Sequence, residues 1–351
     1  MDTLKLDIYE PDTVIDYRRP VIIYCHGGGF TAGNKTTDKA KTFGNYFAKF
    51  GYLFASIDYR LGLENLADTI DNFQEVYQAT QDAKSSVRFF KRYADEYCVD
   101  TASIFMIGTS AGGSICLTSA YWQQSEAETI FNTDALGPLE NSSGNEGYSS
   151  QLKGIISCWG GLPDTAWLRN ETEPNQLFHG TADATVPYVA GFNPDSIYIY
   201  GSFTIHEASL RNGIESNLHA FEGAGHGVGQ TSPAFDTLEQ ITSDFLFTHL
   251  PAGTGNAKCR NGSDDIVSLP VSFVPVTNPS DGNILLTTYN NFNGVLTLFN
   301  AAGQLVHTSP LSISAGDNSN INYTNLASGL YFLQLSNGSG IQTFKLVIMH
   351  P

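Results

Sequence analysis

The sequence predicts an α/β fold, with a mostly parallel sheet flanked by helices, followed by a small β-sandwich domain. In the first two-thirds of the 351-residue chain, short apolar runs alternate with longer helical segments. This alternation is typical of a parallel sheet with right-handed crossovers. Further along the chain, alternating runs separated by turn residues favour antiparallel strands. We therefore expect an α/β domain over residues 1–250, a linker over 251–270 and a β-sandwich over 271–351.

Short apolar runs give the expected positions of the strands. Residues 4–9 alternate in polarity, which is typical of a half-buried first strand. A helix is expected over residues 74–97, where apolar residues such as Ala83 and Val87 recur at helical spacing, and another over residues 235–250. Six further runs are expected to be strands, near residues 21–25, 53–57, 103–108, 154–158, 176–179 and 217–221.

Composition excludes several classes of partner. The formal net charge of −17, from 35 acidic and 18 basic residues, argues against nucleic acid and against anionic membrane surfaces. No run is long and apolar enough for a transmembrane segment. Residues 1–5 lack the apolar segment of a signal peptide, so we interpret the chain as one from which the signal was trimmed.

The five cysteines leave at least one thiol unpaired. Cys25, Cys116 and Cys158 lie in apolar runs, where a free cysteine behaves as a small buried hydrophobic residue. Cys98 and Cys259 each follow a predicted helix, and a disulfide between them is as consistent with the sequence as two free thiols. No cysteine spacing resembles a zinc site, and no metal is expected.

The most informative motif is a serine between glycines, in the segment Gly108-Thr109-Ser110-Ala111-Gly112. The segment joins an apolar strand to a predicted helix. A serine on such a sharp turn projects its hydroxyl clear of the sheet, which is the geometry of a nucleophile. Glycines flank it because a Cβ atom there would collide with the neighbouring elements. Ser110 is therefore the predicted nucleophile.

A second glycine-rich loop, His26-Gly27-Gly28-Gly29, follows the strand at residues 21–25. Backbone N–H groups of such a loop can stabilise the oxyanion of a tetrahedral intermediate. We assign the oxyanion hole to the amides of Gly28, Gly29 and Ala111. His26 is expected to hold the loop by a hydrogen bond. The alternative is a glycine-rich turn without a chemical role.

An acid and a base are expected further along the chain. Asp183 follows a short strand, and its carboxylate can accept the Nδ1–H of a histidine and stabilise the imidazolium. His226 lies in a glycine-rich loop and is the predicted general base. Alternatively, Asp183 is only a turn residue, and His179 or His219 takes the role of base. We expect instead that His179 supports the acid loop and that His219 lies within a strand.

Three aromatic residues are candidates for a substrate pocket: Phe30 beside the glycines, and Trp159 and Trp167 after the strand that follows the nucleophile helix. Aromatic side chains commonly line such pockets. Packing in the core is an equally good interpretation of the tryptophans. Two polar inserts, at residues 121–150 and 188–213, are expected to shape the pocket.

These motifs together resemble the carboxylesterases of the hormone-sensitive-lipase and feruloyl-esterase-like branch of the α/β-hydrolases. The resemblance covers about residues 4–250, and the order Ser110, Asp183, His226 is that of this fold. It implies hydrolysis of short-chain or plant-polymer-linked esters without a cofactor. The strand at residues 4–9 indicates that the helical cap of many relatives is missing. Thr109 stands where many relatives have an acidic residue. Both departures favour an open-pocket esterase. The matching segments are 26–30, 58–61, 108–113, 179–183 and 223–227.

The last eighty residues resemble the C-terminal sorting domain of the type IX secretion system of Bacteroidetes. This resemblance implies contact with the secretion machinery and a secreted or cell-surface location. The alternative is a carbohydrate-binding or adhesion module, but all three tryptophans lie in the first domain, so the tail has no row of them. The matching segments are 278–282, 300–304, 326–331 and 344–348.

The expected function is that of a secreted serine esterase acting on a small-molecule or polysaccharide-linked ester. One alternative is a peptidase of the prolyl-oligopeptidase type, against which the missing propeller domain and the His-Gly-Gly-Gly loop argue. The other is a non-catalytic binding protein on a hydrolase scaffold, although such proteins usually lose a member of the triad. The natural acyl and alcohol groups and the oligomeric state stay open.

Overall fold

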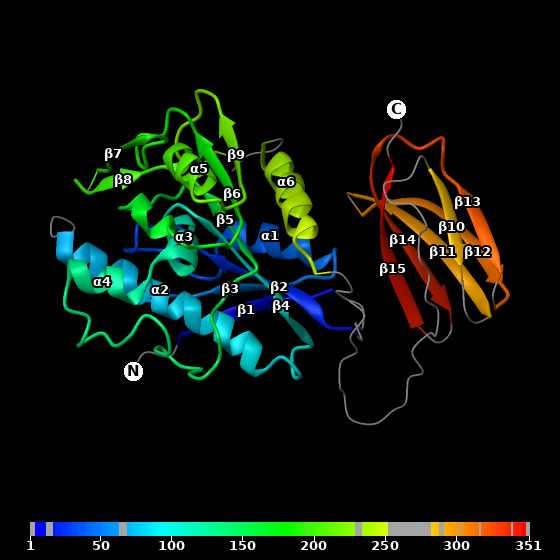
Figure 1. The fold of residues 1–351 in the computed structure, drawn as a ribbon, viewed down its shortest axis with the longest axis horizontal. Helices are drawn as coiled ribbons and strands as arrows, with labels where there is room; N and C mark the ends of the chain where they lie inside the picture. The colour runs from blue at the N-terminus through cyan, green and yellow to red at the C-terminus, as the bar shows by residue number, and fades with distance from the viewer. Residues whose placement is uncertain are drawn as a thin grey trace. The chain divides into compact units, whose positions relative to one another are not determined.

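The structure is a computed structural model that describes residues 4–11, 17–62, 69–194, 196–228, 234–251, 282–287, 291–301, 303–315, 317–337 and 340–348. The chain divides into two compact units, residues 1–260 and residues 261–351 (Figure 1). All of the predicted linker except Pro251 lies outside the described residues.

A seven-stranded sheet forms the centre of the first unit, in the order β1-β3-β2-β4-β5-β6-β9. β1 runs antiparallel to β3, and the other neighbouring pairs are parallel. The prediction of a mostly parallel sheet flanked by helices is confirmed. The strands are β1 (Leu6–Tyr9), β2 (Arg19–Cys25), β3 (Leu53–Ile57), β4 (Val99–Thr109), β5 (Gly154–Cys158), β6 (Asn175–Gly180) and β9 (Ser216–Phe221).

Each face of this sheet has its own hydrophobic core, because successive side chains of a strand point to opposite faces. In β2, Val21 and Ile23 belong to one core, and Ile22 and Tyr24 belong to the other. The first core is covered by α2 (Thr69–Arg92), α3 (Ala111–Tyr121), α4 (Gln124–Ile130) and α5 (Ser202–Arg211), and the second by α1 (Asp38–Ala48) and α6 (Ala234–Thr248). None of the described helices is long and apolar enough to cross a membrane.

Helix α2 begins five residues before its predicted start and ends at Arg92, not at residue 97. The chain leaves the helix through turns, in which the Tyr97 amide donates to the Tyr93 carbonyl and the Val99 amide to the Ala94 carbonyl. Cys98 then adopts a φ of 55°, which reverses the chain into β4. Apolar residues in these turns continue the helical pattern, so periodicity alone misplaced the helix end.

Cys25, Cys116 and Cys158 are buried free thiols, as predicted. Cys98 is disulfide-bonded. Cys259, the other half of the disulfide considered from the sequence, lies outside the described residues.

The second unit contains a four-stranded antiparallel sheet, in the order β12-β11-β14-β15, and a two-stranded sheet of β10 and β13. One core contains side chains from both sheets, such as Leu286 of β10 and Leu298 of β11. This arrangement is the predicted small β-sandwich. Its strands are β10 (Asn283–Thr287), β11 (Phe292–Asn300), β12 (Leu305–Ile313), β13 (Asn318–Asn322), β14 (Gly329–Asn337) and β15 (Gly340–Ile348).

Candidate active site

Ser110 stands on the turn between β4 and α3, with φ of 57° and ψ of −122°. A non-glycine residue rarely adopts this conformation, so the turn is strained. A Cβ atom on Gly108 would lie 2.1 Å from the Gly112 carbonyl oxygen, and one on Gly112 would lie 2.0 Å from the Cys25 carbonyl oxygen. The turn therefore requires glycine at both positions.

Ser110, His226 and Asp183 meet at the carboxyl edge of the sheet, since they follow β4, β9 and β6. His226 Nε2 lies 2.8 Å from Ser110 Oγ, and His226 Nδ1 lies 2.8 Å from Asp183 Oδ2. Because an ionised carboxylate only accepts hydrogen bonds, Nδ1 carries the proton and Nε2 accepts from the serine hydroxyl. The structure thus brings together the three residues assigned from the sequence.

The Asp183 carboxylate is buried, and burial alone would raise its pKa. Hydrogen bonds from His179, from His226 and from the Val186 amide outweigh burial and hold the pKa of Asp183 well below its usual range. The Thr185 and Val186 amides donate to Oδ1 over 2.8 and 2.9 Å. Asp183 is therefore ionised at neutral pH and fixed in orientation.

His179 supports the acid loop, as predicted. Its Nε2 donates to the Val186 carbonyl over 2.9 Å and lies 3.3 Å from Asp183 Oδ2. Its Nδ1 therefore accepts from the Ser202 hydroxyl of α5, over 2.7 Å. Sequence reasoning missed Ser202 and the contact with Asp183 itself. His219 lies within β9 and stacks on Phe178, and so is not part of this chain of hydrogen bonds.

The glycine loop, residues 26–29, lies directly against the turn that carries Ser110, which we call the nucleophile turn. A Cβ atom on Gly27 would lie 2.8 Å from the Thr109 carbonyl oxygen and 3.2 Å from Ser110 Cβ. Gly28 has a φ of 130°, and a Cβ atom there would lie 1.9 Å from the Ala32 carbonyl oxygen. Gly29 has a φ of 60° but open space around the Cβ position. The loop therefore passes close to Ser110 in a backbone conformation that favours glycine.

Contacts made by His26 hold the glycine loop in place. Its Nδ1 donates to the Gly27 carbonyl over 2.7 Å, and its ring stacks on Tyr59 with centroids 4.3 Å apart. The Tyr59 hydroxyl donates to the His26 carbonyl over 2.7 Å. These contacts fix the direction of the glycine loop, in keeping with the supporting role expected for His26.

The two candidate pocket tryptophans are packed in the core. Trp167 is 4% exposed and stacks on Trp122 with centroids 4.7 Å apart. Trp159 is 1% exposed, and the Lys39 ammonium lies 5.2 Å from its ring centroid. A ring surrounded by protein cannot contact substrate. Both tryptophans therefore pack in the core, and neither lines a substrate pocket. Phe30 is half-buried, with its ring centroid 6.4 Å from that of Tyr59.

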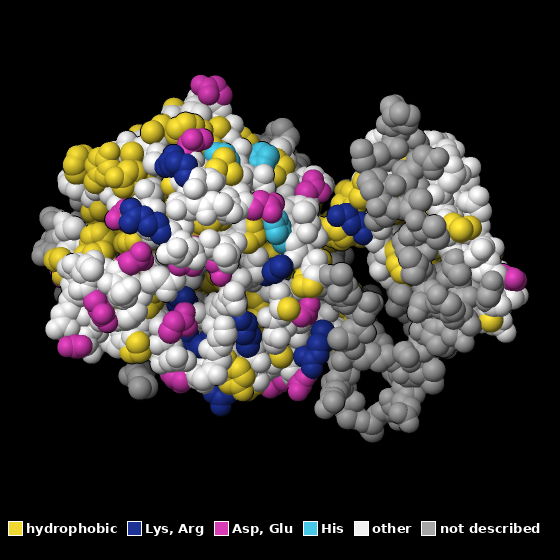
Figure 2. Space-filling model, in the orientation of Figure 1, with side chains coloured by type: hydrophobic (Ala, Val, Ile, Leu, Met, Phe, Trp, Pro, Cys, Tyr) yellow, Lys and Arg dark blue, Asp and Glu magenta, His cyan; other side chains and the backbone are white. Residues whose placement is uncertain are grey.

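The two inserts differ in where they pack. The insert at 188–213 folds back on the acid loop through a hairpin of β7 (Ala190–Phe192) and β8 (Tyr198–Tyr200), followed by α5. Phe192 and Tyr198 are exposed, and a hydrophobic cluster covers β7 and β8 in Figure 2. The insert at 121–150 instead packs along α2, for example where Gln81 donates to the Leu136 carbonyl. Among the described residues, the 188–213 insert borders the acid loop, where Ser202 bonds to His179, and the 121–150 insert borders α2.

Two families match this chain. Residues 6–161 match the BD-FAE family, and residues 277–349 match the secretion system C-terminal sorting domain.

Esterases occur among both the relatives and the solved structures that are similar to this chain. An acetyl esterase of Salmonella schwarzengrund is 27% identical over 222 residues, which are 57% of this chain and 65% of that protein. The match thus spans less than two thirds of that relative. Liver carboxylesterase B-1 of Rattus norvegicus is 30% identical over 113 residues, which are 32% of this chain and 20% of that protein.

Among solved structures, the propionate-bound esterase 2 of Thermogutta terrifontis is 25% identical, with a TM-score of 0.55, and the match covers 70% of this chain and 89% of that one. The same esterase phosphorylated by paraoxon is 27% identical, with a TM-score of 0.54, and the match covers 70% of this chain and 88% of that one. By these matches the first part of the chain has the α/β-hydrolase fold and is similar to esterases, and residues 277–349 match the secretion system C-terminal sorting domain.

Proposed function

We propose that this protein is a secreted serine carboxylesterase that cleaves short-chain or plant-polymer-linked acetyl or feruloyl esters through an acyl-serine intermediate. The observation that carries the proposal is the continuous chain of hydrogen bonds from Ser110 through His226 to Asp183, with both bonds 2.8 Å long. A serine next to a base that is oriented by a buried carboxylate is an activated nucleophile.

In the first half-reaction, Ser110 Oγ attacks the ester carbonyl carbon and its proton moves to His226 Nε2. The tetrahedral intermediate collapses, the bond to the alcohol oxygen breaks, and His226 returns the proton to the leaving alcohol. In the second, His226 removes a proton from water, whose oxygen attacks the acyl carbon, and the acid leaves as Ser110 regains its proton. The negative charge on Asp183 stabilises the imidazolium of His226 in both half-reactions.

The oxyanion is stabilised by the amides of Gly28, Gly29 and Ala111 in this proposal. The contact of the glycine loop with the nucleophile turn supports the two glycine donors. Ala111 is the first residue of α3, so its N–H lies at the positive end of that helix. Loss of one such donor typically costs a factor of about 10² to 10³ in rate.

Short acyl groups are supported by the relatives, since one is an acetyl esterase and one structure neighbour contains propionate. The exposed aromatic rings of the β7–β8 hairpin offer contacts for the aryl or polymer part of a larger ester. The sorting domain supports export, so the substrate is met in the secreted or cell-surface location of the enzyme.

The test compares the parent protein with Ser110→Ala on the p-nitrophenyl esters of acetate, propionate and butyrate, on methyl ferulate and on a prolyl peptide p-nitroanilide. We expect hydrolysis that is fastest on acetate or on methyl ferulate and absent in the variant, with an unchanged circular dichroism spectrum. Ester hydrolysis that persists in Ser110→Ala would refute the proposed nucleophile. Cleavage of the peptide alone would favour the peptidase alternative.

A further inference from the structure

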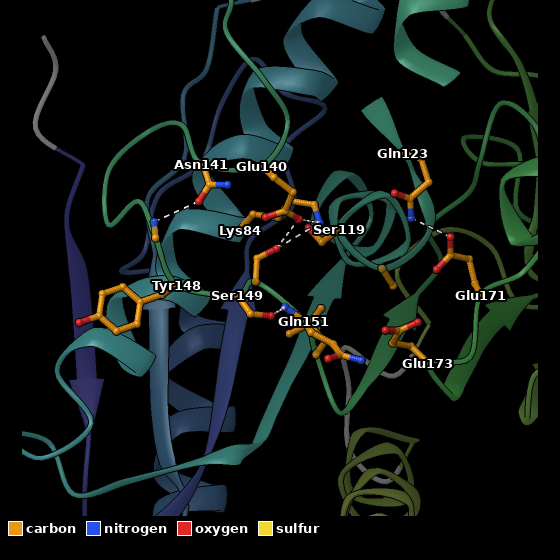
Figure 3. Close-up of a pocket in the computed structure, with 14 residues that line it drawn as sticks. Lys84, Ser119, Gln123, Glu140, Asn141, Tyr148, Ser149, Gln151, Glu171 and Glu173 are labelled. Atoms are coloured by element: carbon orange, nitrogen blue, oxygen red, sulfur yellow. Dashed lines mark hydrogen bonds and ion pairs between the residues drawn. The ribbon is translucent and has the colours of Figure 1, made fainter. Parts of the chain in front are cut away.

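A cavity of about 500 Å³ lies at the amino edge of the sheet (Figure 3). The cavity is lined by residues 147–152, just before β5, by Glu171 and Glu173, just before β6, and by the last turn of α3. Ser110, Asp183 and His226 follow the carboxyl ends of their strands. Because β4, β5, β6 and β9 are parallel, the cavity and the reacting residues lie at opposite edges of one sheet.

An ion pair forms the central part of the cavity lining. Lys84 Nζ donates to Glu140 Oε1 over 2.6 Å and to Ser150 Oγ over 3.3 Å, and Ser150 Oγ donates to the same Glu140 oxygen over 2.5 Å. Lys84 and Ser150 are buried. The single cation of the lining is thus neutralised by the protein itself and does not favour an anionic ligand.

Side chains that combine donors and acceptors flank the ion pair on both sides (Figure 3). Gln123 Nε2 donates to Glu171 Oε1 over 2.7 Å, which leaves the amide oxygen of Gln123 and the second oxygen of Glu171 as acceptors. Asn141 Oδ1 accepts from the Gly147 amide over 3.0 Å, which leaves the amide N–H groups of Asn141 as donors. These hydrogen bonds fix the side chains before any ligand arrives, which lowers the entropic cost of binding.

The remaining chemistry of the lining narrows the class of ligand. Ser119 also lines the cavity, and its buried hydroxyl has no hydrogen-bond partner among the described residues. Glu140, Glu171 and Glu173 outnumber Lys84, so phosphate and carboxylate ligands are disfavoured. No group of three or more metal-ligating side chains occurs in the described part of the chain. Fixed amides, carboxylates and hydroxyls suit a ligand that carries many hydroxyl groups.

We propose that this cavity binds a unit of a neutral saccharide, as a recognition site separate from Ser110. Sugar hydroxyls donate to Gln123 and Glu171 and accept from the Asn141 amide. The volume falls within the range of small-ligand sites, about 300–1,000 Å³. The site would hold the protein on a sugar polymer without taking part in ester cleavage.

The test measures saccharide binding by calorimetry in the full chain with Ser110→Ala, so that no substrate is consumed. The probes are xylohexaose, cellohexaose and mannohexaose, with inorganic phosphate and spermidine as the anionic and cationic comparisons. Glu171→Ala and, in a second variant, Gln123→Ala each remove one member of the hydrogen-bonded pair on one side of the cavity. Glu96→Ala removes an exposed carboxylate outside it and is the matched control.

We expect at least one hexasaccharide to bind, with affinity about tenfold lower in Glu171→Ala and in Gln123→Ala and unchanged in Glu96→Ala. With Ser110 intact, Glu171→Ala should hydrolyse p-nitrophenyl acetate at the parental rate, so this result is separate from the proposed function. No hexasaccharide binding, equal binding in all variants, or binding of phosphate or spermidine only would each overturn the proposal. If Glu171→Ala does not fold, Gln123→Ala alone decides.

Discussion

The two edges of the central sheet use polar residues in opposite ways. At the carboxyl edge, Ser110, His226 and Asp183 form a chain of hydrogen bonds along which a proton can move, and Ser110, the proposed nucleophile, stands on a strained turn. At the amino edge, the buried ammonium of Lys84 pairs with the exposed carboxylate of Glu140, so the two charges balance each other. Under the two proposals, one sheet separates chemistry from recognition, because reaction needs a mobile proton and binding needs fixed partners.

The largest expected effect on activity comes from a variant that changes the carboxyl edge alone. His226→Ala removes the base, and kcat/KM for p-nitrophenyl acetate should fall by a factor of about 10⁴ or more. Glu171→Ala at the amino edge should leave it unchanged. Steady-state kinetics on both variants measure the contrast. Equal losses in the two variants would show that the edges are not functionally separate.

The glycine loop gives the next largest effect. Gly28→Ala places a Cβ atom 1.9 Å from the Ala32 carbonyl oxygen at a φ of 130°, so the loop backbone must rearrange and its amides lose their arrangement. We expect kcat to fall by a factor of about 10² to 10³. Gly29→Ala is the matched control, because its Cβ position is open and only the φ of 60° opposes alanine. A loss in Gly29→Ala as large as in Gly28→Ala would contradict this explanation.

His179 connects the acid loop to α5 and should have a smaller effect. His179→Leu removes the donor to Asp183 and to the Val186 carbonyl, and we expect kcat to fall by a factor of about ten with little change in KM. His179→Gln keeps an N–H donor and should recover part of the loss. If both variants lose only thermal stability and keep the parental kcat, His179 does not position Asp183.

The smallest expected effect is on the free energy of unfolding. Its dependence on pH should have opposite signs for a carboxyl group at each edge, Asp183 and Glu171. The pKa of Asp183 is lowered in the folded state, so its stabilising contribution is present above its ordinary pKa and is lost as pH falls through the lower folded pKa. Burial, with Glu173 and Glu126 nearby, raises the pKa of Glu171, so its contribution is present below its ordinary pKa and is lost as pH rises.

Urea unfolding of Asp183→Asn and Glu171→Gln at pH 3 and at pH 8 measures this difference, because pH 3 lies below the ordinary pKa of both carboxyl groups. Asp183→Asn should destabilise more at pH 8 than at pH 3, whereas Glu171→Gln should be less destabilising at pH 8 than at pH 3. The same pH trend in both variants would contradict the opposite pKa shifts.

The carboxyl edge could be predicted from the sequence because its residues lie in short motifs with strict backbone requirements. Gly108 and Gly112 mark the turn at Ser110, and Asp183 and His226 each follow a strand, so parallel topology brings them together. The amino-edge cavity has no such signal, since its lining comes from four distant segments and ordinary polar residues. Trp159 and Trp167 show a further limit: an aromatic residue after a strand does not reveal whether its ring faces the core or a pocket.

The central claim is that Ser110 is the nucleophile that His226 activates. Reaction of the parent protein with a fluorophosphonate probe, followed by peptide mass spectrometry, tests it most directly. We predict one adduct, on Ser110, that is absent in Ser110→Ala and forms much more slowly in His226→Ala. No adduct on the parent protein, or an adduct on a different residue, would contradict the claim.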